Sequence, residues 1–268
     1  NTYGHTVDDI SCTYILWWEA SEEECILAQG IEWIDGWCKL KKEEFSDYKE
    51  IYFTEDSTHK LYVYCEDALG NWVEDTEEFL VDSTPPETTK RYGYPYVEGP
   101  FPKYCDLDNG DNHDGQCGWA EWINTSTPIS LSAWDEKVGV DKIRWRNLLV
   151  QRGEPEWFIC GFPQQYCNPQ IYMQYVENPE EPFIEYTDEF YKEEESCHII
   201  EYYSVDKLGN EEDLQWQCVF VDDTAPEVDK TIGEPKEIIG DYTYISGKTP
   251  ITLDCWDIEP HPVDHVSL

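Results

Sequence analysis

Two long segments of this chain repeat each other, and this repeat constrains the fold more than any other feature of the sequence. The segment HKLYVYCEDALGNWVEDTEEFLVDSTPPE, from His59, aligns with HIIEYYSVDKLGNEEDLQWQCVFVDDTAPE, from His198, at an offset of 139 residues that becomes 140 after the Leu-Gly-Asn turn. A second pair, TPISLSAWD (127–135) and TPITLDCWD (249–257), aligns at an offset of 122 residues. Recurrence on this scale is typical of a chain built from repeated structural modules.

The repeated segments have the alternation of β-strands. Ile129 and Leu131 alternate with serines, and Leu61, Val63 and Cys65 fall on one face of another segment. Gly-Asn pairs supply turns between these segments, and Pro-containing exits end them. Short alternating strands with this punctuation predict an all-β fold made of antiparallel β-sandwiches.

The order of the repeated segments predicts three parts. Residues 88–229 hold one complete module, residues 1–87 lack its Thr-Pro strand, and residues 230–268 contain little besides that strand. Both ends of the chain therefore fall at nearly the same point of a module, so one module is split between them. The acidic stretch 41–50 is the best candidate for a short helix. No initiator Met or basic signal region precedes Asn1, so we expect processing or an excerpt of a longer chain.

The segments HIIEYYSVDKLGN, VFVDDTAPE and DCWDIEPHPVDHV resemble the immunoglobulin-like repeats of large prokaryotic, especially archaeal, surface proteins. The resemblance covers most of the chain but not the insertions 12–50 and 145–190. It implies tandem immunoglobulin-like sandwich modules, and a place in a stalk, an adhesin or a filament wall.

The charge of the chain limits its partners. With 18 basic and 58 acidic residues, a net charge of −40, the surface repels nucleic acid and anionic lipid, and cations are its natural counterpart. A content of 40% hydrophobic and 15% aromatic residues nevertheless predicts a folded chain. The longest apolar run, 14–18, is too short to span a membrane.

Eleven cysteines favour an oxidising compartment, so we expect an extracellular or cell-surface protein. Local spacing predicts four disulfides: Cys25–Cys38, Cys105–Cys117, Cys160–Cys167 and Cys197–Cys218. The immunoglobulin-like resemblance places Cys65 and Cys255 on inward positions that hold an inter-sheet disulfide. Cys255 of one unit is thus predicted to bond the Cys65 position of the next, the alternatives being a partner beyond Leu268 or a buried thiol. The partner of Cys12 stays open.

The segment CDLDNGDNHDGQC (105–117) is the sharpest local signal for a ligand. Glycines at 110 and 115 allow turns that bring hard oxygen donors together, as calcium requires, although the spacing is not that of an EF-hand. The predicted ligands are Asp106, Asp108, Asn109, Asp111 and Asp114. The alternative is a solvated acidic loop closed by a disulfide.

Other motifs favour structural roles. The sequence contains no HExxH, paired CxxC, Ser/His/Asp arrangement or phosphate loop, so we predict no enzyme, with a hydrolase as a weak alternative. His59 and His198 recur on strands and are predicted to be packed or edge residues.

Aspartates recur at strand ends, where turn chemistry is favoured over weak cation sites. Two tryptophan pairs, 119 with 122 and 17 with 18, suggest sugar stacking, but strand packing is favoured. Asn124 begins a glycosylation sequon.

These observations together predict an extracellular structural protein that forms a head-to-tail filament or surface stalk. Its partners are copies of itself. The modules join either by strand complementation, in which residues 230–268 complete residues 1–87 of the next copy, or by continuation of a longer chain. The alternative function is a monomeric carbohydrate-binding or adhesive module, whose partners are glycans.

Overall fold

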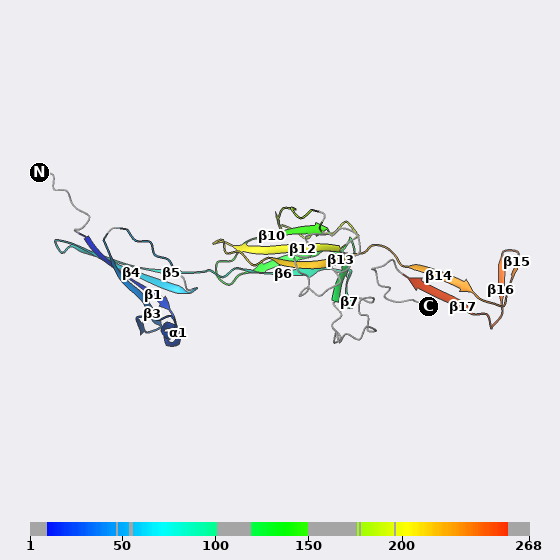
Figure 1. Cartoon of the computed structure of the whole chain (residues 1–268), viewed down its shortest axis with the longest axis horizontal. Coiled ribbons are helices and arrows are strands. Elements are labelled where there is room, and N and C mark those ends of the chain that lie inside the picture. The colour runs from blue at the N-terminus through cyan, green and yellow to red at the C-terminus, as the bar shows by residue number, and fades with distance from the viewer. Residues whose placement is uncertain are drawn as a thin grey trace. The chain divides into compact units, whose positions relative to one another are not determined.

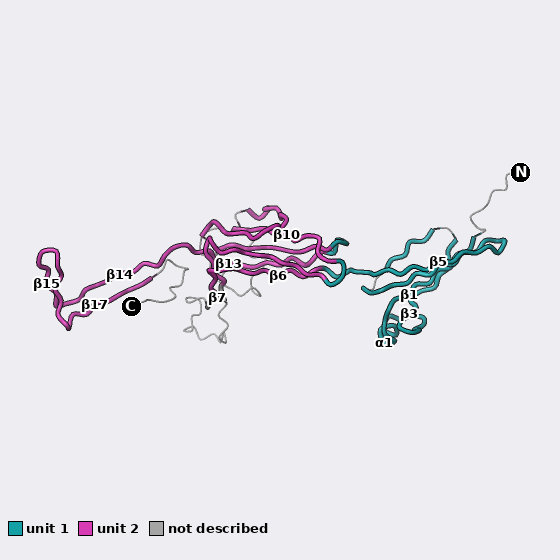
Figure 2. Tube along the Cα trace, turned by 180° about the vertical axis from the view of Figure 1, so that it is seen from behind, with its two compact units in different colours: residues 1–85, 136–138, 207–210 teal, residues 86–135, 139–206, 211–268 magenta. Residues whose placement is uncertain are grey.

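The computed structural model describes residues 10–46, 48–53, 56–100, 119–149, 176, 178–195 and 197–256. The chain divides into two compact units (Figure 2). Unit 1 comprises residues 1–85, 136–138 and 207–210, and unit 2 comprises residues 86–135, 139–206 and 211–268. Along the sequence, unit 1 gives way to unit 2 after residue 85, close to the predicted boundary after residue 87. The predicted third part, 230–268, falls within unit 2.

The protein is all-β and largely antiparallel, as the alternation predicted (Figure 1). Unit 1 contains β1 (Ile10–Glu19), α1 (Glu22–Leu27), β2 (Glu32–Ile34), β3 (Trp37–Phe45), β4 (Thr58–Asp67) and β5 (Trp72–Leu80). Unit 2 contains β6 (Glu87–Tyr92), β7 (Tyr96–Pro100), β8 (Trp119–Ile123), β9 (Ile129–Trp134), β10 (Val140–Leu149), β11 (Ile184–Glu185), β12 (Cys197–Asp206), β13 (Gln215–Val221), β14 (Glu227–Ile232), β15 (Lys236–Ile239), β16 (Tyr242–Ile245) and β17 (Ile251–Trp256).

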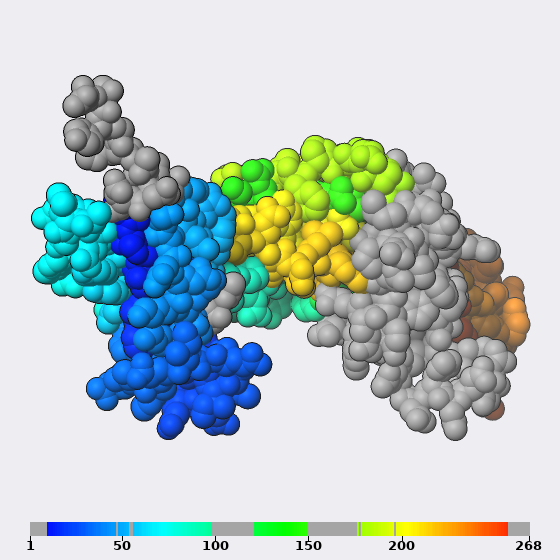
Figure 3. Space-filling model, turned by 60° about the vertical axis from the view of Figure 1, so that its left-hand side comes forward, coloured from blue at the N-terminus to red at the C-terminus, as the bar shows by residue number. Residues whose placement is uncertain are grey.

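Unit 1 is built on one antiparallel sheet with the strand order β2-β3-β1-β4-β5. Strand β1 lies at its centre and pairs with β3 on one side and β4 on the other. In the space-filling view β1 is visible as a narrow dark blue strip between neighbouring segments of unit 1 (Figure 3). Cys12, Tyr14 and Leu16 of β1 are buried and alternate with half-buried residues, which is the period-2 pattern of a strand. The Tyr14 hydroxyl donates a hydrogen bond of 2.7 Å to Glu43, which ties β1 to β3.

The prediction of a helix at residues 41–50 is wrong. Residues 41–45 continue β3, because pairing with β1 extends along the whole strand. Helix α1 begins instead after Ser21, whose side chain accepts a hydrogen bond from the Glu24 amide while the Glu24 carboxylate accepts one from the Ser21 amide. This reciprocal capping box satisfies two amides of the first turn. Within the described part of the chain, no helix is long and apolar enough to cross a membrane.

Two sheets of unit 2 share one core. The larger sheet has the order β11-β10-β12-β13-β8-β7, with β13 and β8 parallel, and β6 pairs with β9 in a separate two-stranded sheet. The core combines Ile129 and Leu131 of β9 with Ile200 and Tyr202 of β12 and with Val219 of β13. Removal of these side chains from water holds the two sheets face to face.

The last described segment, residues 227–256, forms two further strand pairs, β14/β17 and β15/β16 (Figure 1). All positions of β15 and β16 are exposed, and β14 and β17 each contain a single half-buried residue. A two-stranded pair without a covered face is at best marginally stable in water. The segment therefore exposes nearly all of its strand residues to solvent.

Candidate functional site

The pair β14/β17 repeats the pair β6/β9. In each pair six residues of one strand lie opposite six residues of the other in the same antiparallel register. The register begins with Glu87 opposite Trp134 in the first pair and with Glu227 opposite Trp256 in the second. The pairs β7/β8 and β15/β16 match in the same way. Residues 227–256 are thus a second copy of the first four strands of unit 2.

The corners that join these strand pairs also recur. At each corner a threonine hydroxyl donates a hydrogen bond to one proline carbonyl, and a glycine amide donates to a second. The groups are Thr127 with Pro95 and Gly93 with Pro128 in one copy, and Thr249 with Pro235 and Gly233 with Pro250 in the other. A Cβ on either glycine would lie 2.5 or 2.7 Å from the proline ring, so both corners require glycine.

The two copies differ in how far their inward side chains are buried. In the first copy, Ile123, Ile129 and Leu131 are 4%, 0% and 5% exposed. Their counterparts Ile245, Ile251 and Leu253 are 47%, 52% and 43% exposed. Strands β12 and β13 cover the first set, and nothing in the described part of the chain covers the second to the same extent. Among the described residues, the second copy thus has no sheet opposite it that matches β12 and β13.

The sheet of unit 1 repeats the sheet that covers the first copy. Strand β4 pairs with β1 as β12 pairs with β10, so that His59 and His198 occupy equivalent positions. The two histidines are 0% and 2% exposed, which confirms the prediction that they are packed. After each final strand a threonine hydroxyl donates to an acidic side chain, Thr84 to Asp56 in unit 1 and Thr224 to Glu195 in unit 2. The sheet of unit 1 thus repeats the sheet that contains β10, β12 and β13.

Strand β5, the counterpart of β13, leaves an open edge. In unit 2 the outer side of β13 pairs in parallel with β8, where Phe220 lies opposite Trp122. Among the described residues no strand occupies this side of β5. Val73 and Leu80 of β5 are 63% and 82% exposed. An open edge with exposed apolar residues is a site for pairing with another strand.

A buried ion pair lies inside the core of unit 2. The Lys90 ammonium, whose side chain is 2% exposed, lies 3.7 Å from a Glu121 carboxylate oxygen and 3.3 Å from the centroid of the Tyr92 ring. The Tyr92 hydroxyl donates a 2.8 Å hydrogen bond to the same carboxylate. Burial lowers the pKa of Lys90 to about 7, and the Glu121 carboxylate opposes this shift. The core accommodates Lys90 because an acid and an aromatic ring face it.

The structure confirms one predicted disulfide and corrects the assignment of Cys65. Cys25 and Cys38 are bonded and join α1 to β3. Cys65 is bonded to Cys12, which lies directly opposite it on β1. The predicted bond between Cys65 and Cys255 is therefore wrong, because a partner within the same sheet occupies Cys65. Cys255 is a half-buried thiol.

The predicted bond between Cys197 and Cys218 is also wrong. Cys197 is disulfide-bonded, but Cys218 is a buried thiol. Cys197 lies opposite Phe220 and Cys218 lies opposite Ile199, so the two cysteines are staggered by two residues along neighbouring strands. The remaining predicted cysteine pairs, Cys105–Cys117 and Cys160–Cys167, lie outside the described residues.

The predicted calcium ligands, Asp106, Asp108, Asn109, Asp111 and Asp114, also lie outside the described residues. Two of the strand-end aspartates hold turns. Asp67 accepts hydrogen bonds of 2.9 Å from the amides of Leu69 and Asn71, and Asp135 accepts one of 2.6 Å from the amide of Gly139. For Asp67 the turn interpretation is confirmed.

Two of the tryptophans that suggested sugar stacking, Trp122 and Trp17, contact other side chains of the protein. Trp122 is 6% exposed and stacks on Phe220 with 4.5 Å between ring centroids. The Lys39 ammonium lies 5.3 Å from the centroid of the Trp17 ring. The amide oxygen of Asn124 accepts hydrogen bonds from the Ser126 amide and hydroxyl, at 2.9 and 2.7 Å, and glycosylation at this residue stays a prediction.

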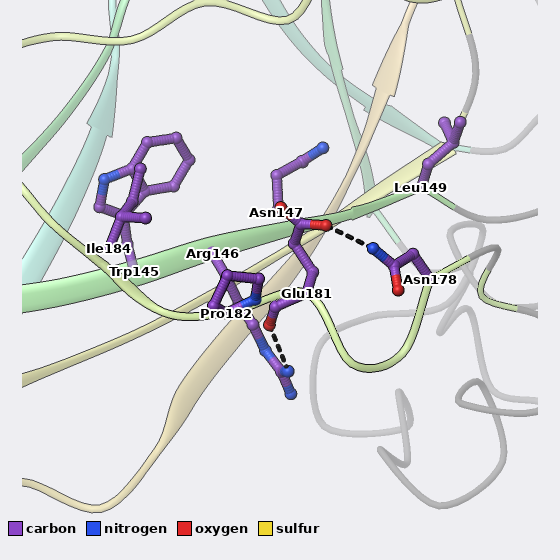
Figure 4. Close-up of a pocket in the computed structure, with 8 residues that line it drawn as sticks. All are labelled: Trp145, Arg146, Asn147, Leu149, Asn178, Glu181, Pro182 and Ile184. Atoms are coloured by element: carbon purple, nitrogen blue, oxygen red, sulfur yellow. Dashed lines mark hydrogen bonds between the residues drawn. The ribbon is translucent and has the colours of Figure 1, made fainter.

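Unit 2 also contains a pocket beside β10 (Figure 4). The Arg146 guanidinium in its wall donates to the Glu201 carboxylate at 2.5 Å and to the carbonyls of Pro179 and Glu181 at 3.1 and 2.9 Å. Asn178 donates to the Glu181 side chain at 2.5 Å. These hydrogen bonds engage the Arg146 guanidinium and the Asn178 side-chain amide with neighbouring groups of the protein. Its lining residues are Trp145, Arg146, Asn147, Leu149, Asn178, Glu181, Pro182 and Ile184.

No protein-family model matches this chain, and no curated protein matches its sequence.

Proposed function

We propose that this chain is an extracellular, non-enzymatic structural protein whose modules join head to tail into a filament or surface stalk. In this proposal residues 87–221 form a complete immunoglobulin-like sandwich. A second sandwich is completed at each joint, where residues 227–256 of one copy supply the first four strands and the sheet of residues 10–81 of the next copy supplies the others.

The contrast in burial between equivalent side chains carries this proposal. Ile251 and Leu253 repeat Ile129 and Leu131 in register but are about half exposed. Burying such side chains favours association by about 25 cal/mol for each Å² of apolar surface. The sheet that covers Ile129 and Leu131 in the complete module is repeated in unit 1, which supports the sheet of unit 1 as the partner of Ile251 and Leu253.

The complete module also indicates how the joint is arranged. Strand β16 takes the place of β8 and lies parallel to β5 of the next copy, which closes the open edge. Ile251 takes the place of Ile129, which exchanges two backbone hydrogen bonds, of 2.9 and 3.1 Å, with Phe190. Such a contact joins two different surfaces, so it propagates along one direction unless it closes into a ring. The same contact would form within one molecule if the two halves of the module followed one another along a longer chain.

Disulfides and charge support the proposed location. The bonds Cys12–Cys65 and Cys25–Cys38 are stable in an oxidising compartment and rare in the cytosol. The net charge of −40 keeps copies dispersed until two complementary surfaces meet. We also propose that the segment 105–117 binds calcium, on the strength of its closely spaced oxygen donors.

Sedimentation velocity of the purified chain over a range of concentrations tests the joint. We expect the chain to form concentration-dependent oligomers that Leu253→Asp abolishes, because the charge would enter the core of the joint. Thr252→Asp on the opposite face of β17 is the matched control and should assemble normally. A wild-type chain that stays monomeric at every concentration, or equal assembly of the two variants, would exclude joining by separate copies.

A further inference from the structure

Lys230 is the counterpart of the buried Lys90. Lys90 lies opposite Leu131 in the β6/β9 pair, and Lys230 lies opposite Leu253 in the β14/β17 pair. Lys230 is exposed and forms no ion pair with any other described residue. A joint that covers Leu253 also covers Lys230, since the two are cross-strand neighbours on one face. A buried ammonium without an acidic partner is strongly unfavourable, so we expect the joint to supply an acid.

The strands that accompany Lys230 do not supply this acid. In the complete module the acid is Glu121 on β8, which lies opposite Glu98 of β7. The equivalent position on β16, opposite Ile238 of β15, is Thr243. The carboxylate that pairs with the buried lysine of the complete module is therefore missing from residues 227–256.

The sheet of unit 1 has an acid at the neighbouring position. In the complete module the strand beside Glu121 is β13, which carries the neutral residue Gln217, 7% exposed, opposite Ile200. In unit 1 the residue equivalent to Gln217 is Glu77, opposite Leu61 on β4. Glu77 is exposed and, like Lys230, has no ion pair with another described residue. The acid thus lies on β8 in the complete module, whereas in the proposed split module it lies on β5, the counterpart of β13.

The register identifies Glu77 as the nearest acid of β5. In the complete module Phe220 lies opposite Trp122, which places Val219 beside Glu121. Phe79 is the counterpart of Val219, since the two lie opposite His59 and His198. Glu77 is the next residue on the same face as Phe79, about 7 Å along the strand, within reach of a lysine side chain. Asp75 shares this face but lies one further step away.

We propose that Lys230 of one copy forms a buried ion pair with Glu77 of the next copy, and that this pair selects the head-to-tail partner. This inference rests on the proposed function. It names the contact by which residues 227–256 of one copy recognise the sheet of unit 1 in the next copy. Neither half can satisfy both residues alone, so the pair favours the complementary half over other exposed strand edges.

Charge exchange tests this pair. Association of the full chain is measured by sedimentation equilibrium for wild type, Lys230→Glu, Glu77→Lys and the double variant that carries both changes. We expect each single change to weaken association by about 100-fold or more, and the double variant to recover to within about 10-fold of wild type. Circular dichroism verifies folding of every variant, which we expect to be unchanged because both residues are exposed in the unassembled chain.

Two controls match the changes in net charge. Lys248→Glu alters an exposed turn residue, and Glu78→Lys alters the opposite face of β5, where Glu78 forms a surface ion pair with Lys60. Both controls should associate as wild type does. If wild type associates and Leu253→Asp abolishes association, but Glu77→Lys has no more effect than Glu78→Lys, the ion pair is refuted while the proposed function stands. If wild type does not associate, the joint between copies and the ion pair both fail.

Discussion

Leu131 and Leu253 form a matched pair whose substitution by alanine measures the split module directly. They occupy equivalent positions on β9 and β17, but they are 5% and 43% exposed. Leu131→Ala leaves a cavity in a packed core, so we expect it to lower the free energy of unfolding by about 2–5 kcal/mol. Complete burial of a leucine contributes about 1.5–3 kcal/mol, so Leu253→Ala should cost only about 1–2 kcal/mol in the unassembled chain.

Assembly should make the two leucines equivalent. If the joint buries Leu253 as fully as Leu131, the cost of Leu253→Ala rises by about 1–3 kcal/mol, which weakens the association constant about 5- to 150-fold. Urea unfolding followed by tryptophan fluorescence in dilute solution gives the first cost, and sedimentation equilibrium gives the second. Equal unfolding costs for the two variants in dilute solution, or an unchanged association constant for Leu253→Ala, would refute the reasoning.

Three further predictions concern the disulfide of α1, a buried histidine and the acidic segment. Replacing both Cys25 and Cys38 by serine should lower stability by about 3 kcal/mol in thermal unfolding, because the bond closes a loop between residues only 13 apart in sequence; an unchanged midpoint would contradict this. Burial lowers the pKa of His198 from 6.5 to about 4, so the unfolded chain binds a proton that the folded chain does not, and stability should fall as the pH decreases from 6.5 towards 4. Urea unfolding across this range should show a weaker pH dependence for His198→Gln, and identical slopes would count against it. Calorimetric titration with calcium should release or absorb heat that is lost when Asp108 and Asp111 are changed to asparagine, whereas heat that persists in the variant would exclude the segment as the site.

Much of the strand arrangement could be predicted from the sequence because its information is local. The alternation around Leu61 and Ile129 predicts strands, and the copies at His59 and His198 predict equivalent places in two sheets, which the structure confirms. The bond Cys25–Cys38 follows from short spacing. The helix was readable too, since Ser21 and Glu24 have the spacing of a capping box, but the acidic stretch after it was favoured instead.

The wrong cysteine pairs depended on register, which the sequence does not determine alone. Cys197 and Cys218 lie 11 and 10 residues from Leu208 in sequence, but the strand pairing is shifted by two residues from the register that would bring them opposite each other, so Cys197 lies opposite Phe220. The sequence repeats place Cys12 at the start of an insertion, and only the pairing of β1 with β4 brings it opposite Cys65. Both errors arise because a small shift along a strand changes every cross-strand neighbour.

The buried lysine was missed because a charged residue on a strand is normally read as solvent-facing. Lys90 stands between Thr88 and Tyr92 at the spacing of a buried face, and that alternation was the available signal. Its burial depends on Glu121, which lies 31 residues further along the chain on a different sheet. Contacts of this kind follow from the packing of sheets, which strand periodicity does not specify.

The disulfide between Cys12 and Cys65 determines how unit 1 responds to a mechanical pull. A force applied across residues 10 and 85 passes from β1 to β4 through the covalent bond and bypasses the chain between the two cysteines, whose separation in sequence is 53. That stretch would extend to roughly 170–190 Å if it unravelled, at about 3.3–3.6 Å for each residue. While the bond is intact this length cannot be drawn out, so the unit behaves as a short, stiff link. Reduction would convert the same link into a long, extensible one.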